Sequence, residues 1–384
     1  MLVPKLRFKR EDGTDYPEWE EKRVGEILTL CHGKDYKHLE KGDIPVMGTG
    51  GVITYVNEAL CDWQCVCIGR KGTIDRPYFM DKPFWSVDTL FYSKPVSDNM
   101  PKFQYYLFQN INWQLYNEAS GVPSLSASTI ENVKVKVPDI EEQQKIADFL
   151  STIDEVIAQS EAEVQNLEQQ KKAAMQKIFS QEVRFKREDG TEYPGWEEIK
   201  LGIIGKAMSG SGFSEKYQGH KDLPIPFYKV SDMNNTGNEI IMCNANNYVS
   251  EELLSKMGLK ACQHNAIIFA KVGAALMLDR KRIANAPFLV DNNMMIYVPI
   301  TNNELQYIYY WFTSIRLSKY AQVGALPSFN ASDIESILIP IPCLEEQQKI
   351  AGFLSAYDEA ISYAKQELDK WKELKKGLLQ QMFV

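Results

Sequence analysis

The sequence predicts an α+β protein in which two mixed α/β domains lie in tandem and each is followed by one long helix. Three observations predict this architecture. The 384 residues are enough for two or three hydrophobic cores. The helical phrase EEQQKIADFLSTIDEVI at Glu141 is nearly repeated as EEQQKIAGFLSAYDEAI at Glu345. A second phrase, FKREDGTDYPEWEE at residues 8–21, returns as FKREDGTEYPGWEE at residues 185–198. The chain is therefore a tandem duplication.

The two copies have drifted in length, and the change is concentrated in one stretch. The helical phrase repeats at an offset of 204, but the lead-in phrase repeats at 177. Aligning IPVM at Ile44 with IPFY at Ile225 gives 181, and aligning RKG at Arg70 with KVG at Lys271 gives 201. Most of the extra residues then fall within 226–270. A constant scaffold with one region of variable length is typical of a recognition surface.

Two prolines mark the expected boundaries between the globular regions and the long helices. Pro138 and Pro342 precede the two long helices, where a helix start is expected. We expect globular domains at 1–138 and 183–341, a central long helix at 139–182 and a C-terminal long helix at 342–384.

Each globular region is expected to mix strands and aromatic-rich helices. The predicted strands are IPVM, QCVCIG, PFWSVDTLFY and VKVKVP in the first copy, and FYKVSDM, NAIIFAKVG, APFLVDNNMMIYVPI and ILIPIP in the second. The predicted helices are KFQYYLFQNINWQLYNE and NELQYIYYWFTSIRLSKY. Their rings are expected in the core rather than on a stacking surface.

Both long helices carry an apolar seam with alternating spacings of four and three residues. The first seam consists of Ile146, Leu150, Ile153, Ile157, Ser160, Val164, Leu167, Lys171, Ala174 and Ile178. The second consists of Ile350, Leu354, Tyr357, Ile361, Ala364, Leu368, Trp371, Lys375, Leu378 and Met382. Each helix could simply pack on its own domain, but two matched seams favour a coiled coil within the chain. A pseudo-twofold relation between the copies would make that pair antiparallel.

The distribution of charge keeps DNA open as a partner although the net charge is −8. Residues 141–180 carry eight acids and four bases, and residues 345–384 carry seven acids and six bases. By contrast, residues 28–138 hold eleven of each, and residues 205–344 hold twelve bases and eleven acids. The acidity thus lies mainly on the repeated segments, and the globular regions have room for basic patches.

No recognisable catalytic or metal motif appears in the sequence. Cys61, Cys65 and Cys67 do not have the usual spacing of a zinc site, so buried structural cysteines are the favoured interpretation. The sequence contains no P-loop, H-E-x-x-H or G-x-S-x-G motif, and NAPF at Asn285 only superficially resembles the Asn-Pro-Pro-aromatic motif of adenine methyltransferases. The chain has neither a leader-like apolar segment nor a membrane-length apolar run, so we expect it to be cytoplasmic.

The repeated EEQQKIA-x-FLS-x-x-D helix starts, the paired W-E-E lead-ins and the variable regions between them resemble the specificity subunit of type I restriction–modification systems. The resemblance covers essentially the whole chain. It implies two target recognition domains that each read half of a split DNA site, separated by two long antiparallel helices that bind two methyltransferase subunits. Restriction subunits join when they are present. It also implies that the chain is not catalytic by itself, and that S-adenosylmethionine, ATP and Mg belong to the partner subunits.

The resemblance and the repeat together suggest a partner-binding surface at the helix starts. The candidates are Glu141, Glu142, Gln143, Gln144 and Lys145, matched by Glu345, Glu346, Gln347, Gln348 and Lys349. Recent duplication alone would explain their identity equally well. A rigid helix pair of fixed length would also set the number of unread base pairs between half-sites.

Polar and basic residues on the predicted loops are the candidates for DNA contact. In the first region these are Lys34, Tyr36, Lys37, Gly48, Thr49, Gly50, Gly51, Arg70, Lys71 and Arg76. In the second they are Ser209, Ser211, Lys229, Ser231, Asp232, Asn234, Lys271, Arg280, Lys281 and Arg282. The GTGG turn lacks the G-K-[ST] ending of a nucleotide loop. The alternative function is a coiled-coil adaptor with two peptide-binding domains, although it does not explain divergent loops on matched scaffolds.

Overall fold

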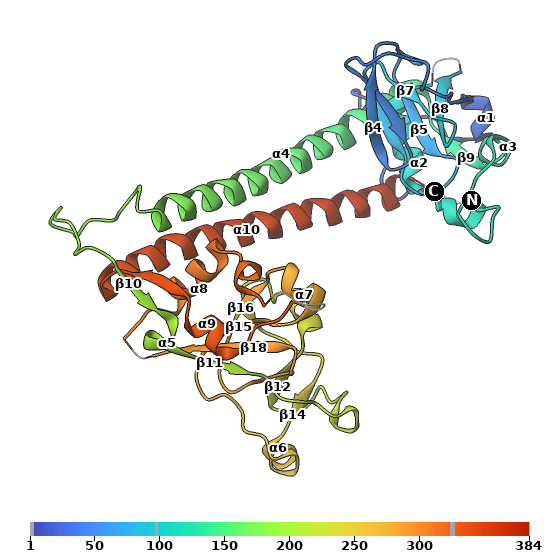
Figure 1. The fold of residues 1–384 in the computed structure, drawn as a ribbon. Coiled ribbons are helices and arrows are strands. Elements are labelled where there is room, and N and C mark those ends of the chain that lie inside the picture. The colour runs from blue at the N-terminus through green and yellow to red at the C-terminus, as the bar shows by residue number, and fades with distance from the viewer. Residues whose placement is uncertain (1–3, 97–98, 301, 323–326, 384) are drawn as a thin grey trace. The chain divides into compact units, whose positions relative to one another are not determined.

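The computed structural model describes residues 4–96, 99–300, 302–322 and 327–383. The chain divides into two compact units, Met1–Glu163 with Ala364–Val384, and Val164–Tyr363. Each unit holds one globular region and parts of the two long helices, α4 (Ile140–Phe179) and α10 (Leu344–Met382) (Figure 1).

In the residues that the structure describes, the first globular region forms three small sheets and four short helical segments. In chain order it comprises β1 (Glu20–Arg23), α1 (Val24–Ile27), β2 (Leu28–His32), β3 (Ile44–Gly48), β4 (Gly51–Val56), β5 (Cys65–Gly69), β6 (Tyr78–Met80), β7 (Trp85–Ser86), β8 (Leu90–Pro95), α2 (Pro101–Asn110), the 3-10 helix η1 (Trp113–Tyr116), α3 (Ala127–Glu131) and β9 (Lys134–Val137). The sheet orders are β2-β8-β5-β6, β4-β3-β7 and β1-β9. All pairs are antiparallel except β3 with β7.

The second globular region repeats this plan with additions. It comprises β10 (Glu197–Lys200), α5 (Leu201–Ile204), β11 (Gly205–Ser209), η2 (Glu215–Tyr217), β12 (Ile225–Tyr228), η3 (Val230–Asn234), β13 (Ile241–Met242), β14 (Tyr248–Val249), α6 (Glu251–Met257), β15 (Ala266–Ala270), α7 (Gly273–Met277), β16 (Lys281–Ala284), β17 (Leu289–Val290), β18 (Met294–Pro299), α8 (Leu305–Ser314), η4 (Leu317–Tyr320), α9 (Ala331–Glu335) and β19 (Leu338–Ile341). The sheet orders are β11-β18-β15-β16-β13, β14-β12-β17 and β10-β19.

Strand register confirms the alignment of the two copies that the sequence suggested. Val46 pairs in parallel with Trp85 in the first unit, and Phe227 pairs in parallel with Leu289 in the second. These pairs are related by the offsets of 181 and 204 that the short sequence landmarks gave. IPVM and IPFY are therefore the same strand in two copies.

The extra residues of the second copy lie in two places. The offset between equivalent residues rises from 181 at Ile44 to 193 at its hairpin partner Val56, and to 201 at Cys61. The first rise corresponds to the long connection from β12 to β14, which replaces the tight turn between β3 and β4. The second corresponds to α6. The predicted location of the length change is confirmed.

The aromatic helices are shorter than the sequence predicted. α2 and α8 end at Asn110 and Ser314, and a separate 3-10 turn follows each. The next residue takes an extended backbone in both copies, and the Trp113 indole N–H donates to the Phe108 carbonyl at 2.9 Å. This bond satisfies a carbonyl that the helix end leaves open. The rings themselves are core, as predicted, and the fully buried ones include Phe108.

Two predicted strands are each broken by a turn. PFWSVDTLFY forms β7 and β8 around residues 87–89, and APFLVDNNMMIYVPI forms β17 and β18 around residues 291–293. The Leu90 amide donates to the Val87 carbonyl, and the equivalent Met294 amide donates to Asp291, both at 3.0 Å. Because both halves of each run are apolar, the periodicity of the sequence hid the turn.

The long helices approach each other in antiparallel order within the first unit. Asp154 and Glu161 of α4 form ion pairs with Lys375 and Lys372 of α10, at 2.6 and 2.7 Å. Residue numbers rise along one helix as they fall along the other.

The second unit shows the same order. Lys171 lies 2.5 Å from Asp358, while Ile178 belongs to the same hydrophobic cluster as Ile350. The helix ends also pack into the domain cores, as Ile146 and Leu150 do in the first unit. The long helices therefore pack on the globular domains and also contact each other. Their pairing as a coiled coil stays a prediction.

Candidate nucleic-acid interface

The turn at residues 87–89 fixes the loops that carry the candidate DNA contacts of the first unit. The Lys34 amide donates to the Ser86 carbonyl at 2.7 Å, and the Arg70 amide donates to the Thr89 carbonyl at 2.7 Å. Loops that are distant in the sequence thus meet at one edge of the domain.

The turn at residues 291–293 does the same in the second unit. The Ser211 amide donates to the Val290 carbonyl at 3.0 Å, and the Lys271 amide donates to the Asn293 carbonyl at 2.9 Å. Ser211 and Lys271 are the equivalents of Lys34 and Arg70. Two of the candidate residues in each unit are therefore held by equivalent main-chain bonds.

Gly33 precedes Lys34, and Gly210 precedes Ser211. In both copies the backbone of the turn lies too close to this position to leave room for a side chain. A Cβ at Gly33 would lie 2.0 Å from the Val87 carbonyl oxygen, and a Cβ at Gly210 would lie 1.9 Å from that of Asp291. Neither position tolerates a side chain without a shift of the backbone.

The first-unit candidates fall into three classes of exposure. Lys34, Lys37, Gly50, Lys71 and Arg76 are exposed, Tyr36, Thr49, Gly51 and Arg70 are half-buried, and Gly48 is buried. The buried Gly48 is corrected to a structural role, because a Cβ there would lie 2.8 Å from the Ile53 side chain. Tyr78 fixes the turn by donating to the Thr49 carbonyl at 2.9 Å.

The second-unit candidates are more often committed to internal contacts. Ser209, Ser231 and Asn234 are exposed, Ser211, Lys229, Lys271, Arg280 and Arg282 are half-buried, and Asp232 and Lys281 are buried. The two buried residues are not available to DNA, so their predicted contacts are corrected.

Asp232 holds a loop together. Its carboxylate accepts a hydrogen bond from the Lys229 amide at 2.8 Å and another from the Asn246 side-chain amide at 2.6 Å. Burial raises the pKa of this carboxyl group. The residue was chosen as a polar group on a loop, but its polarity serves the loop itself.

Lys281 lies between an acid and a main-chain carbonyl. Its ammonium is 2.7 Å from the Asp279 carboxylate and 2.9 Å from the Ile315 carbonyl, and burial lowers its pKa. The neighbouring Arg282 donates to three main-chain carbonyls, including that of Lys281 at 2.8 Å. Arg280 donates to the Asn234 side chain. Arg280 is half-buried, and its contact with DNA stays a prediction.

Sequence reasoning missed two features of this surface. Asn238 is fully buried and its amide makes four hydrogen bonds that close the connection between β12 and β14. The asparagine-rich run around it is the signal that could have indicated such turns. On the first unit, Val52, Ile53 and Tyr55 of β4 are more than half exposed. The sequence could not predict that the apolar side chains of this hairpin strand are exposed, because the alternation of residues along a strand does not show which face is covered.

Four of the ten candidate partner contacts are buried, which corrects their assignment to the surface. Glu142 is fully buried, and its carboxylate accepts from the Arg7 guanidinium at 2.6 Å and from the Trp19 indole at 3.0 Å. Glu346 accepts from Arg184 at 2.7 Å and from Trp196 at 2.9 Å. This bond to the carboxylate raises the pKa of each arginine.

The adjacent glutamines are also internal. Gln143 donates to the Pro138 carbonyl at 3.0 Å, and Gln347 donates to the Pro342 carbonyl at 2.9 Å. The repeat of these buried residues follows from packing of the lead-in phrase against the helix start, so it needs no partner.

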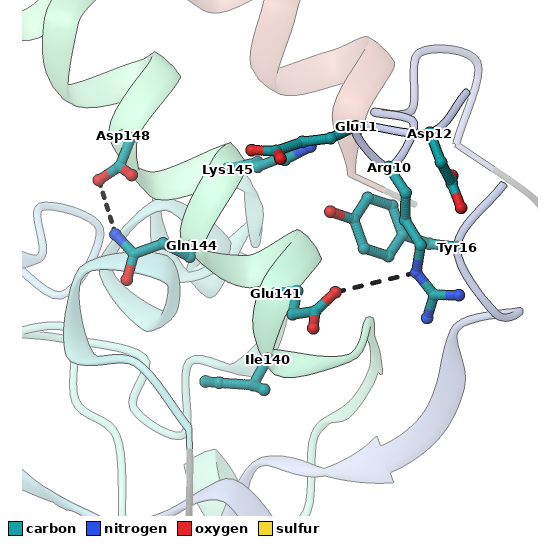
Figure 2. Close-up of a pocket in the computed structure, with 9 residues that line it drawn as sticks. All are labelled: Arg10, Glu11, Asp12, Tyr16, Ile140, Glu141, Gln144, Lys145 and Asp148. Carbon is teal, nitrogen blue, oxygen red and sulfur yellow. Dashed lines mark hydrogen bonds and ion pairs between the residues drawn. The ribbon is translucent and has the colours of Figure 1, made fainter. Parts of the chain in front are cut away.

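The six remaining candidates, of which Lys145 and Lys349 are half-buried and the other four exposed, line two equivalent pockets, which we call the lead-in pockets. The first has a volume of about 780 Å³ and is lined by Arg10, Glu11, Asp12, Tyr16, Ile140, Glu141, Gln144, Lys145 and Asp148 (Figure 2). The second has a volume of about 630 Å³ and is lined by Arg187, Glu188, Asp189, Tyr193, Glu345, Gln348 and Lys349.

The side chains around each lead-in pocket are arranged in the same way. In the first, Arg10 and Lys145 lie 5.2 and 5.5 Å from the centre of the Tyr16 ring, and Arg10 points toward Glu141 (Figure 2). In the second, Arg187 and Lys349 lie 5.0 and 5.7 Å from the Tyr193 ring. Both pockets offer an aromatic ring with two cations near it, and carboxylates are among their lining residues.

Within the described part of the chain, no three His, Cys, Asp or Glu side chains are placed to hold a metal ion. The predicted burial of Cys61, Cys65 and Cys67 is confirmed. In that same part, no helix combines the length and apolar character that crossing a membrane requires.

Comparison with known proteins matches one family of domains to both copies of the repeat. The model of the type I restriction modification DNA specificity domain matches residues 16–169 and 193–372. The MjaVIII specificity subunit of Methanocaldococcus jannaschii is 24% identical over 416 residues, covering 97% of this chain and 94% of that protein. The MjaIX specificity subunit of the same organism is 27% identical over 300 residues, covering 74% of this chain and 68% of that protein.

Two solved structures share the fold of this chain. The crystal structure of a type I system S subunit from M. genitalium matches with a TM-score of 0.65 at 15% identity, covering 100% of this chain and 99% of the other. A structure described as showing complex assembly of the type I R-M system matches with a TM-score of 0.57 at 13% identity, covering 95% and 97%. With the domain model matched twice, once on each copy of the duplicated frame, the chain belongs to the type I restriction modification DNA specificity family.

Proposed function

We propose that this chain is the DNA-reading subunit of a type I restriction–modification complex, in which each globular region reads one half of a split target. The observation that carries the proposal is the shared frame at residues 87–89 and 291–293, which holds equivalent loops in both units. The family assignment supports DNA as the ligand and does not favour a peptide-binding adaptor.

The reading segments differ while the frame stays the same. The first unit presents a tight hairpin turn, and the second presents a long connection closed by Asn238. Different loops on one frame are expected to read different bases, because direct readout depends on which donors and acceptors reach the groove.

The experiment replaces two equivalent basic residues, Arg70 and Lys271, one at a time with alanine. Loss of a bidentate base contact costs about 1–3 kcal/mol and relaxes one position of the target. Arg70→Ala should change only the half-site read by the first domain, and Lys271→Ala only the other half-site. Sequencing of methylated adenines in cells that carry the chain and its partner measures both.

Lys134→Ala is the matched control, because Lys134 is an exposed lysine of the first unit whose ammonium forms an ion pair with Glu21 beside the sheet β1-β9. It should leave both half-sites intact. Equal damage to both half-sites by Arg70→Ala, or no change at all, would contradict the assignment of one domain to one half-site.

The lead-in pockets are proposed to receive the methyltransferase partner, one copy for each half. Along the paired helices, 13 of the first 17 positions from Glu141 and Glu345 are identical, but only five of the next 22. One duplication produced both stretches, so common origin alone does not explain the contrast. Retained side chains that are exposed or half-buried at both pockets fit a surface that meets the same partner twice.

We assign the catalytic steps to the partner subunits. Restriction subunits join in complexes that have them, and S-adenosylmethionine, ATP and Mg are placed on the partner subunits. The chain by itself is proposed to be non-catalytic and to act in the cytoplasm. Methyl transfer by the isolated, contaminant-free chain would contradict this division.

A further inference from the structure

The diverged end of the long helices has kept a pair of lysines. Residues 158–179 and 362–383 share only five identities, yet Lys171-Lys172 and Lys375-Lys376 account for two adjacent ones. Drift in the surrounding positions shows that this stretch was free to change. The retained lysines therefore need a physical reason.

The first lysine of each pair has an internal role. Lys375 lies 2.6 Å from the Asp154 carboxylate and 5.4 Å from the centre of the Tyr106 ring. Lys171 lies 2.5 Å from Asp358, and 4.9 Å from the Tyr310 ring. Packing and ion pairing explain these two residues.

The second lysine of each pair has no such explanation. Lys172 and Lys376 are exposed, and neither forms a hydrogen bond or ion pair with any residue that the structure describes. An isolated surface lysine is usually free to change, so its retention beside drifting neighbours points to a contact outside the chain.

In the first unit, Lys376 lies in a groove of about 390 Å³, which we call the cationic groove. It is lined by Asp75, Arg76, Pro77, Gln109, Lys372, Lys375, Lys376 and Leu379. These residues come from the loop before β6, the end of α2 and the C-terminal half of α10. The groove thus joins a predicted DNA-contact residue, Arg76, to the long helix.

The charges of the cationic groove leave one net positive charge for a ligand. Lys375 and Lys372 are neutralised by Asp154 and Glu161, which lie at 2.6 and 2.7 Å. Arg76 and Lys376 remain, while Asp75 accepts a hydrogen bond from the Gln114 amide at 3.1 Å and adds one negative charge. A guanidinium and an ammonium beside a side-chain amide suit a singly charged phosphodiester.

We propose that the cationic groove holds a backbone phosphate of the DNA on the flank of the half-site read by the first domain. The inference rests on the proposed function. Strand register places Arg280 of the second unit at the position equivalent to Arg76, because β5–β6 and β15–β16 pair alike. Lys172 and Arg280 are the corresponding residues there, with Arg280 already held by Asn234. The groove positions DNA and carries no base preference of its own.

The experiment measures DNA binding by the complete complex with its methyltransferase partner over a range of salt concentrations. One duplex carries the target that methylation sequencing identifies, and a second has both half-sites scrambled. Lys376→Ala and Arg76→Ala should each weaken binding to both duplexes by the same factor. Each should also reduce the slope of log affinity against log salt by about one, as expected for the loss of one phosphate contact.

Lys370→Ala is the matched control, since Lys370 is an exposed lysine of the same helix outside the groove and pairs with Glu367 at 2.6 Å. A slope for Lys376→Ala equal to that of the control overturns the assignment. So does weakening confined to the target duplex, which indicates a base contact, or loss of partner assembly on size-exclusion chromatography with DNA binding unchanged. If the unmodified complex shows no salt-dependent binding to DNA, the proposed function fails with it.

Discussion

The two globular regions are built on the same frame but present different surfaces. The carboxylates of Glu142 and Glu346 accept the same arginine and tryptophan bonds, and the turns at 87–89 and 291–293 share their main-chain bonds to Arg70 and Lys271. The connection after the first strand of the hairpin does not match, since one copy turns at once and the other runs on to β14 through η3 and β13. Buried bonds are retained where any change leaves a polar group unsatisfied. The connection from β12 to β14 is held by its own side chains, so its length and sequence can differ from those of the first copy.

Breaking the buried ion pair should have the largest effect and should be equal in the two halves. Removing one partner of a buried pair costs about 3–5 kcal/mol, and each arginine here retains some exposure, so we expect about 3 kcal/mol for Glu142→Ala and for Glu346→Ala. Calorimetric unfolding measures both losses. Glu141→Ala, at an exposed neighbouring position, should cost less than about 0.5 kcal/mol. A large loss in one half only would break the comparison.

The second largest loss of stability should come from Asn238→Ala, and its effect on DNA reading should be confined to the second half of the molecule. Asn238→Ala removes an amide that bonds to Cys243, Asn244 and Asp232, so we expect a loss of about 2 kcal/mol in unfolding free energy. Methylation sequencing should show relaxed reading of the second half-site alone. Thr236→Ala, an exposed change in the same connection, serves as control. Altered reading of the first half-site would show that the connection is not specific to its own domain.

A smaller effect should appear in the dependence of stability on pH. Burial raises the pKa of Asp291 above its ordinary value, and the equivalent position in the first half is the apolar Val87. The folded state therefore holds this proton more strongly than the unfolded state, so the stability from the group is present below its unfolded pKa and is lost as pH rises through the folded pKa. Asp291→Asn should gain stability relative to the parent between about pH 4 and pH 7. A difference in melting temperature that does not change over this range would contradict the assignment.

The sequence could predict the elements that are repeated or periodic. The repeat located both long helices, the shared scaffold and the region of variable length, because these depend on apolar spacing and on phrases that packing preserves. It could not reveal the turns at 87–89 and 291–293, since apolar strands continue on both sides of each. It also misassigned Glu142, Asp232 and Lys281 to the surface, because a charge in a sequence does not show whether a partner is folded against it. The DNA-contact candidates that remain exposed stay predictions.

The lead-in and helix-start phrases also bear on how new variants of the chain could arise. The buried contacts of Arg7 with Glu142 recur for Arg184 with Glu346, and the amino-acid segments that make them are nearly identical. Recombination within these stretches would join one reading segment to another while every buried bond at the junction is restored. An exchange elsewhere, for instance inside the β12–β14 connection, would separate Asn238 from the backbone groups it satisfies. The protein thus carries its tolerated crossover points at the places where its core is most strictly determined.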